Sequence, residues 1–249
     1  MQIRVFPDED RLARRLADLI GDALGREPEI VLGLPTGRTP IALYAELARR
    51  ARAGEIDFSR ATTFNLDEFL GLPAGHPSSY RQFMERHLFA HVGLAEPRVN
   101  FLNGATPDAG AECERYERAI ERAGGIGLQV LGIGSNGHIG FNEPGPELAA
   151  RTHRVVLRPE TRRANAEFFG GEPDRVPEQA LSMGMATILH ARRLVLIATG
   201  ERKADCVQRM IDGPLTTRLP ASFLQVHRDV LVMLDAPAAA RLAPGAPEN

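Results

Sequence analysis

The chain has 249 residues, 43% of them hydrophobic and 25% charged, and its formal net charge is −2 at pH 7. This balance is typical of globular proteins, and without a basic stripe or an apolar run of ~18–20 residues it argues against nucleic acid and the membrane as partners. The two cysteines, Cys113 and Cys206, lie in helix-like patterns and suit a reducing compartment, so we expect a cytoplasmic protein.

Apolar strand patterns alternate with amphipathic helix patterns along the chain. The expected strands cover residues 3–6, 29–34, 61–66, 128–133, 154–157, 194–199 and 230–234. Helices are expected after the first two strands and over residues 80–91, 111–123, 161–169, 180–189 and 202–211. The second helix should begin at Thr39 and Pro40, with the threonine hydroxyl as its N-cap. Residues 236–249 are rich in alanine and proline and have little to bury, so we expect a frayed tail.

Repeated strand–helix units predict an α/β fold, in which a doubly wound, mostly parallel, Rossmann-like sheet carries helices on both faces. We expect a single domain over residues 1–235, with a small lid over roughly residues 144–180. Ligands of such sheets bind outside the carboxyl ends of the strands. Four segments should meet at that edge: residues 36–37, Asp67, residues 135–143 and residues 200–203.

The stretch LGIGSNGHIGFNEPG, residues 131–145, follows an expected strand and is the most informative in the chain. Its glycines allow sharp turns and close approach of a ligand. His138 suits proton transfer near neutral pH, and Glu143 can fix its tautomer and stabilise its imidazolium form, whereas Asn136 can only orient the ring. The first residues also fit the dinucleotide fingerprint, but no helix can begin at the prolines that follow, and a plain structural turn leaves the histidine and the glutamate unexplained.

Asp67 follows a strand at the same sheet edge, where a carboxylate commonly caps the next helix. Convergence with His138 favours a catalytic base instead. The spacing of His, Cys, Asp and Glu indicates no metal site, and the sequence contains no nucleophile elbow and no P-loop. We therefore expect acid–base chemistry without a metal or a cofactor, on a small anionic substrate.

Two features favour a phosphate group on that substrate. Residues 36–39 precede a helix whose free amides and dipole favour an anion, although they could merely cap it. Lys203 is the only lysine among thirty basic residues, at the carboxyl end of a strand. A lone lysine is usually a solvated side chain, but this one is well placed to meet a phosphate as a point charge.

Several stretches resemble the glucosamine-6-phosphate deaminases of the glucosamine/galactosamine-6-phosphate isomerase family. The likeness covers nearly the whole chain except the tail and includes LGLPTG at 32–37, FNLDEF at 64–69, residues 132–145, TRRANA at 161–166, Val176-Pro177 and the 200–203 turn. It implies conversion of glucosamine 6-phosphate and water to fructose 6-phosphate and ammonia, without a metal.

The resemblance implies that Asp67 removes the C2 proton and that His138 serves opening of the pyranose ring, with Asn136 and Glu143 arranging it. Residues 36–39 and Lys203 match phosphate-binding positions of the family. The predicted site has as catalytic residues Asp67, Asn136, His138 and Glu143, and as substrate- and phosphate-binding residues Thr36, Gly37, Arg38, Thr39, Lys203 and Arg163.

The chain departs from the family pattern at three places. The phosphate-binding arginine of the family aligns with Glu167, and we expect Arg163, on the same helical face, to reach the phosphate instead. Some members carry aspartate at the position of Asn136, which leaves the pH profile open. Some hexameric members are activated by an acetylated sugar phosphate at a basic pair, and His153 and Val155 stand there, so we expect no such activation.

Three alternatives remain at this point. The chain could be an enzyme like 6-phosphogluconolactonase, which releases no ammonia, or a galactosamine-6-phosphate deaminase. It could also be a non-catalytic domain that senses sugar phosphates, although such regulators usually add a helix-turn-helix segment, for which we find no room before Ile3. The expected partner is a phosphorylated amino sugar, and we expect a monomer or a small homo-oligomer.

Overall fold

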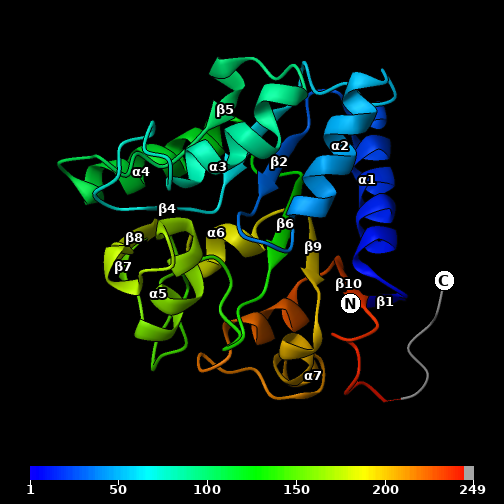
Figure 1. Cartoon of the computed structure of the whole chain (residues 1–249), viewed down its shortest axis with the longest axis vertical. Helices are drawn as coiled ribbons and strands as arrows, with labels where there is room; N and C mark the ends of the chain where they lie inside the picture. Colours follow the sequence, from blue (N-terminus) through cyan, green and yellow to red (C-terminus); the bar gives the residue numbers. More distant parts are fainter. Residues whose placement is uncertain (244–249) are drawn as a thin grey trace.

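The computed structural model describes residues 1–243, and residues 244–249 of the predicted tail lie outside the described part. Seven strands form a sheet in the order β1-β10-β9-β6-β2-β3-β5 (Figure 1), and all neighbours in it run parallel. The strands are β1 Gln2–Phe6, β2 Val31–Leu34, β3 Thr62–Asn65, β5 Val99–Asn100, β6 Leu128–Gly132, β9 Arg193–Ala198 and β10 Val230–Asp235.

Helices cover both faces of this sheet, which confirms the predicted fold class. They are α1 Glu9–Arg26, α2 Ile41–Arg52, α3 Tyr80–His87, α4 Ala109–Arg122, α6 Met185–Leu189 and α7 Ala204–Asp212, whereas α5 Pro159–Asn165 lies on the far side of the pocket. Side chains alternate along a strand, so neighbours in β2 point to opposite faces. Leu32 packs in a core with α1, α2 and α3, and Val31 packs in a second core with α4, α6 and α7.

Several helices begin where the sequence supplies a capping side chain. Asp8 accepts the Arg11 N–H at 2.7 Å before α1, and Asp108 caps α4 in the same way. The expectation that Thr39 caps the second helix was wrong. The helix begins at Ile41 after Pro40, and no side chain caps it, because a tight turn already gives the Ile41 N–H a partner in the Arg38 carbonyl.

A second, antiparallel sheet lies beside the first at the end that carries the glycine-rich loop (Figure 1). Its order is β4-β8-β7, with β4 Asp67–Phe69, β7 His153–Val156 and β8 Gln179–Ser182. The helix expected over residues 180–189 was therefore wrong in its first half, and only residues 185–189 are helical. A short apolar run does not distinguish a strand from a helix, and pairing with β4 and β7 decides the matter here.

Short 3-10 helices connect these elements: η1 Phe89–His91, η2 Glu96–Arg98, η3 Ala166–Phe169, η4 Pro173–Arg175, η5 Glu201–Lys203 and η6 Pro220–Val226. The expected lid, residues 144–180, holds β7, α5, η3, η4 and the start of β8, and its motion as a lid stays a prediction, as does the single domain over 1–235. No helix in the part that the structure describes is both long and apolar enough to cross a membrane.

The predicted frayed tail is wrong for its first residues. Ala238 is fully buried, and its N–H donates to Asp235 Oδ1 at 2.8 Å. Ala239 and Leu242 pack against the core that contains Val31. The lack of large apolar residues wrongly indicated a segment without packing contacts. Small side chains suffice to fill the space beside β10.

Candidate active site

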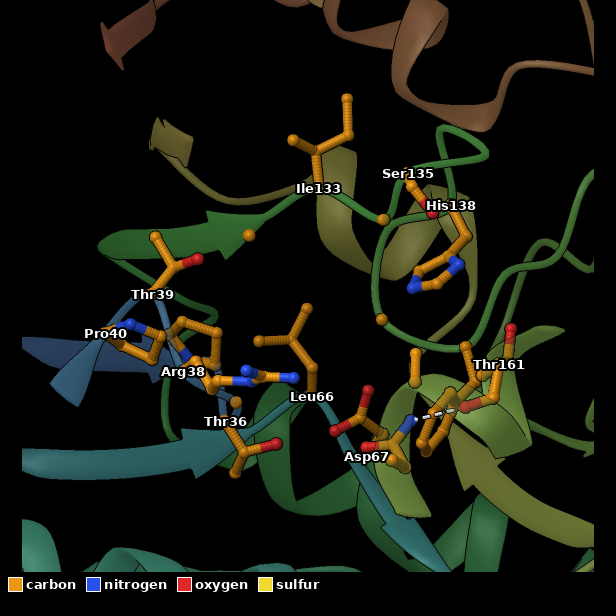
Figure 2. Close-up of a pocket in the computed structure, with 18 of the residues that line it drawn as sticks. Thr36, Arg38, Thr39, Pro40, Leu66, Asp67, Ile133, Ser135, His138 and Thr161 are labelled. Carbon is orange, nitrogen blue, oxygen red and sulfur yellow. Dashed lines mark hydrogen bonds between the residues drawn. The ribbon is translucent and has the colours of Figure 1, made fainter. Parts of the chain in front are cut away.

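A pocket of about 210 Å³ lies at the carboxyl ends of β2, β3, β6 and β9, with α5 and η3 on its other side. Figure 2 shows Asp67, at the start of β4, and His138, in the glycine-rich loop, facing the same space. Eight of the ten predicted site residues line this pocket: Thr36, Gly37, Arg38, Thr39, Asp67, Asn136, His138 and Lys203.

Asp67 enters the pocket where the chain leaves one sheet for the other. β3 ends at Asn65, and β4 begins at Asp67 and pairs with β8. The Asp67 side chain is buried, and burial raises the pKa of its carboxyl to about 8, with the charge of Glu68 adding to the rise. A carboxyl with a pKa near the working pH is suited to general-base chemistry.

Glu68, next along β4, fixes the start of α3. Its carboxylate accepts the N–H groups of Phe69 at 2.8 Å, Tyr80 at 3.0 Å and Arg81 at 2.9 Å. Burial raises the pKa of Glu68 to about 7, and these three hydrogen bonds oppose the rise. By holding Tyr80, Glu68 fixes the pocket wall near Asp67. Burial raises the pKa of the Tyr80 hydroxyl, and the charge of Asp67 raises it further.

His138 is a neutral imidazole at pH 7. Burial lowers its pKa to about 4, with Glu143 opposing this change and the positive Lys203 adding to it. A neutral imidazole can accept a proton and return it. The glycine-rich loop therefore presents a proton acceptor to the pocket.

Glu143 lies behind His138 rather than in the pocket lining, and two side chains hold its carboxylate. Asn136 Nδ2 donates to Oε2 at 3.0 Å, and the Thr161 hydroxyl donates to Oε1. Asn136 also accepts the backbone N–H of His138 at 3.1 Å through Oδ1. Asn136 thus joins the backbone of His138 to the carboxylate of Glu143, and its expected role in orienting the ring stays a prediction.

The loop needs glycine at position 134 because the His138 ring lies against it. A Cβ added there would be 2.3 Å from Cε1 of the imidazole. Gly137 has a φ of +86°, a left-handed conformation that other residues rarely adopt. Gly134 therefore leaves room for the histidine ring, and Gly137 permits the turn that precedes the histidine.

The other end of the pocket gathers positive charge. Gly37 has a φ of +104°, which lets residues 36–39 turn across the end of β2. Lys203 Nζ donates to the Ile133 carbonyl at 2.7 Å. Burial lowers the pKa of Lys203, and the positive charge of Arg38 lowers it further. Two cations therefore act on this end of the pocket, and such a pair favours an anionic group.

The structure does not place Arg163 in the pocket lining, and its contact with a phosphate stays a prediction. The Arg163 guanidinium pairs with Glu160 at 3.3 Å, and the side chain is largely exposed. Glu167, which stands where the family has its phosphate-binding arginine, pairs with Arg38 at 3.2 Å. Arg163 and Glu167, four residues apart, lie on consecutive helical segments, but their side chains have different partners, Glu160 and Arg38.

Two residues that the sequence analysis did not single out belong to the site. Tyr80 lines the pocket, donates its hydroxyl hydrogen bond to Asn165 at 2.9 Å and stacks on Phe141 with ring centroids 5.8 Å apart. Thr161 carries the hydrogen bond to Glu143. The only sequence signal for Thr161 was its place in the stretch TRRANA, and Tyr80 gave none, because its role depends on a contact 85 residues away.

No group of three or more His, Cys, Asp or Glu side chains is arranged to hold a metal within residues 1–243. The expectation of a reaction without a metal or cofactor stays a prediction.

A family model described as "Glucosamine-6-phosphate isomerases/6-phosphogluconolactonase" matches residues 9–233. Among curated proteins, glucosamine-6-phosphate deaminase 2 of Bacillus subtilis is 47% identical over 243 residues, 97% of this chain and 98% of that protein. The glucosamine-6-phosphate deaminase of Mycolicibacterium smegmatis is 46% identical over 97% of this chain and 93% of its own length.

Solved structures show the same likeness. A structure described as a monomeric glucosamine-6-phosphate deaminase superposes with a TM-score of 0.93 at 40% identity, over 96% of this chain and 99% of that one. The 6-phosphogluconolactonase of Trypanosoma cruzi superposes with a TM-score of 0.76 at 22% identity, over 97% of both chains. The second likeness is one of fold alone.

Proposed function

The chain belongs to the family of glucosamine-6-phosphate isomerases and 6-phosphogluconolactonases, and within it we infer that it is a glucosamine-6-phosphate deaminase. It converts glucosamine 6-phosphate and water to fructose 6-phosphate and ammonia. Deaminases from several bacteria match nearly the whole chain at 42–47% identity, whereas the T. cruzi lactonase shares only 22%. The lactonase alternative is therefore not favoured.

The observation that carries this function is that Asp67 and His138 line one pocket together with the two cations Arg38 and Lys203. A phosphorylated hexose has its phosphate at C6 and its reacting carbons at C1 and C2. Binding the phosphate at the cationic end would extend the sugar towards the carboxyl and the imidazole. The pocket thus supplies separate partners for the two ends of the substrate.

In the proposed reaction His138 opens the ring. The neutral imidazole takes the proton of the O1 hydroxyl, the C1–O5 bond breaks, and the proton is delivered to O5, which leaves an open-chain aldehyde. Glu143, held by Asn136 and Thr161, stabilises the imidazolium that exists between these transfers.

Asp67, as a carboxylate, then removes the C2 proton while the C1 oxygen gains one, which gives a C1–C2 enolamine. Return of a proton to C1 gives an imine at C2, and water hydrolyses that imine to the ketone and ammonia. A positioned base contributes about 10²–10⁴ in rate to such a step. Burial of Asp67 suits this task because it makes the carboxylate a stronger base than in water.

The test is ammonia release measured with purified protein on glucosamine 6-phosphate and on galactosamine 6-phosphate, beside lactone hydrolysis on 6-phosphogluconolactone. We expect ammonia and fructose 6-phosphate from the gluco epimer and no lactone hydrolysis. Lactone hydrolysis without ammonia would establish the lactonase, and tight binding of the amino sugar without product over hours would establish a sensor. Sedimentation of the same sample decides between the monomer and the small homo-oligomer expected from the sequence.

A further inference from the structure

One ion pair joins the two sides of the pocket mouth. Arg38 belongs to the loop after β2, and Glu167 belongs to η3. Arg38 Nη2 lies 3.2 Å from Glu167 Oε2, and their side chains are 70% and 66% exposed. Arg38 lines the pocket and Glu167 does not, although the next residue, Phe168, does. In Figure 2 the Arg38 side chain extends from its loop towards the middle of the cavity.

The partner of Arg38 matters because this arginine acts on the cationic end of the pocket. Its charge lowers the pKa of Lys203, so the two cations lie within electrostatic range of each other. Neighbouring like charges that line one cleft favour an anion there. In this structure the Glu167 carboxylate is the anion that meets Arg38.

We propose that Glu167 is an internal competitor of the substrate phosphate: its carboxylate pairs with Arg38 until a phosphate group displaces it, and this exchange lowers the affinity of the pocket for phosphorylated sugars. The inference rests on the proposed function, because Arg38 lies in the phosphate-binding loop assigned there. Glu167 need not touch the substrate to have this effect.

Two arrangements are possible when a phosphate binds: it can displace Glu167 from Arg38, or both anions can contact Arg38 together. Electrostatics favours displacement. At equal distance a dianion attracts the guanidinium about twice as strongly as a carboxylate does, and a phosphate also presents oxygens for a bidentate contact. An exposed ion pair contributes little on its own. A carboxylate that remained at Arg38 would repel the incoming dianion, so the arrangement with Glu167 displaced has the lower energy.

The binding test uses inorganic phosphate as the probe and calorimetry as the readout. Glu167→Gln keeps the size of the side chain and removes its charge. We expect its affinity for phosphate to rise about threefold to tenfold, which corresponds to at most ~1.4 kcal/mol. Unphosphorylated glucosamine should bind the parent and the variant alike.

Glu172→Gln is the matched control. Glu172 also lies in the predicted lid and pairs with an arginine, Arg175, at 2.8 Å, with both side chains largely exposed. Neither residue lines the pocket. This control removes the same unit of charge from the same segment, and its phosphate affinity should equal that of the parent.

Two further readouts separate exchange from a structural effect. In turnover of glucosamine 6-phosphate, Glu167→Gln should lower KM by the same factor by which it raises the affinity for phosphate. It should leave kcat unchanged. Arg38→Ala should lower the affinity for phosphate about tenfold or more. In a protein that already carries Arg38→Ala, Glu167→Gln should change the phosphate affinity less than about twofold, because the effects of coupled residues are not additive.

Phosphate affinity in Glu167→Gln that equals the Glu172→Gln value, or is weaker than the parent value, would overturn the proposal, as would a parent protein that binds no phosphate. If the parent binds phosphate but releases no ammonia from the amino sugar, the deaminase assignment fails, and the phosphate affinities alone then decide the role of Glu167.

Discussion

Nδ1 of His138 lies 3.8 Å from Oε2 of Glu143, and this buried nitrogen has no hydrogen-bond partner among the residues that the structure describes. The distance is too long for a hydrogen bond. The carboxylate nevertheless stays in place, because Asn136 and Thr161 hold both of its oxygens. The pair is thus preorganised for the moment when the imidazole takes a proton and the attraction between the two groups becomes ionic.

Replacing the carboxylate should impair catalysis more than binding. In Glu143→Gln the charge that raises the pKa of His138 is lost, so this pKa should fall below about 4 and the imidazolium should form less readily. We expect kcat to fall about 10²-fold or more, the scale of a lost general acid–base contribution, with KM changed little. Steady-state kinetics and an NMR titration of the His138 ring check both effects. A variant with parental kcat would show that Glu143 has only a structural role.

Gly134→Ala should disturb the same ring without changing a charge. The added methyl group would stand 2.3 Å from Cε1 of His138, so the imidazole must move. We expect kcat to fall about 10²-fold, since small displacements of a catalytic group have effects of that size. Gly75→Ala is the control, because its methyl group meets nothing within 4 Å and its φ is not positive. Equal rates for the two variants would contradict the assigned ring position.

The pH profile should report the raised pKa of Asp67. The carboxyl must lose its proton to act as a base, so kcat/KM should increase with pH and level off above about 8. In a profile measured from pH 5 to pH 9.5, a plateau that already begins near pH 5 would show that Asp67 is not the group whose ionisation limits the reaction.

The same carboxyl also makes the free energy of unfolding depend on pH. Whereas kcat/KM should rise with pH, this free energy should fall. Its folded pKa of about 8 exceeds the ordinary 3.8, so between these values the folded protein binds a proton that the unfolded chain has lost. The free energy of unfolding therefore falls as pH rises through this window. Asp67→Asn lacks this loss, and its thermal stability relative to the parent should increase steadily from pH 4 to pH 8.

The rate curve should be hyperbolic and insensitive to an acetylated sugar phosphate. The residues at the expected activator positions, His153 and Val155, both lie on β7, and neither carries the fixed positive charge of an arginine or lysine. Burial lowers the pKa of His153, so this side chain is neutral at pH 7. Initial rates with and without N-acetylglucosamine 6-phosphate check this. A sigmoidal curve that the compound straightens would contradict it.

The sequence predicted the parallel sheet because β1, β2 and β9 each read as an apolar run followed by an amphipathic helix. It also predicted that Asp67 and His138 meet, since the carboxyl ends of parallel strands share one edge. The second sheet was missed. β4 and β8 are short, and their state depends on pairing between Asp67 and Ser182, which no local pattern records.

The position of Arg163 outside the pocket lining has a similar cause. Helical spacing fixes which residues share a stretch of helix, but not which partner a long exposed side chain chooses. Arg163 turns to Glu160 and Arg38 turns to Glu167. The second contact joins segments 129 residues apart, and only the fold brings them together.

The most direct test of the account is hydrogen exchange at C2 of glucosamine 6-phosphate in heavy water, followed by NMR for the parent and for Asp67→Asn. With the parent, solvent deuterium should enter C2 of the substrate and C1 of the product, the two carbons between which the proton moves. The asparagine variant, which keeps the shape of the side chain, should still bind the sugar phosphate in calorimetry but should leave the C2 proton in place. Exchange at the parental rate in Asp67→Asn would show that another group abstracts this proton.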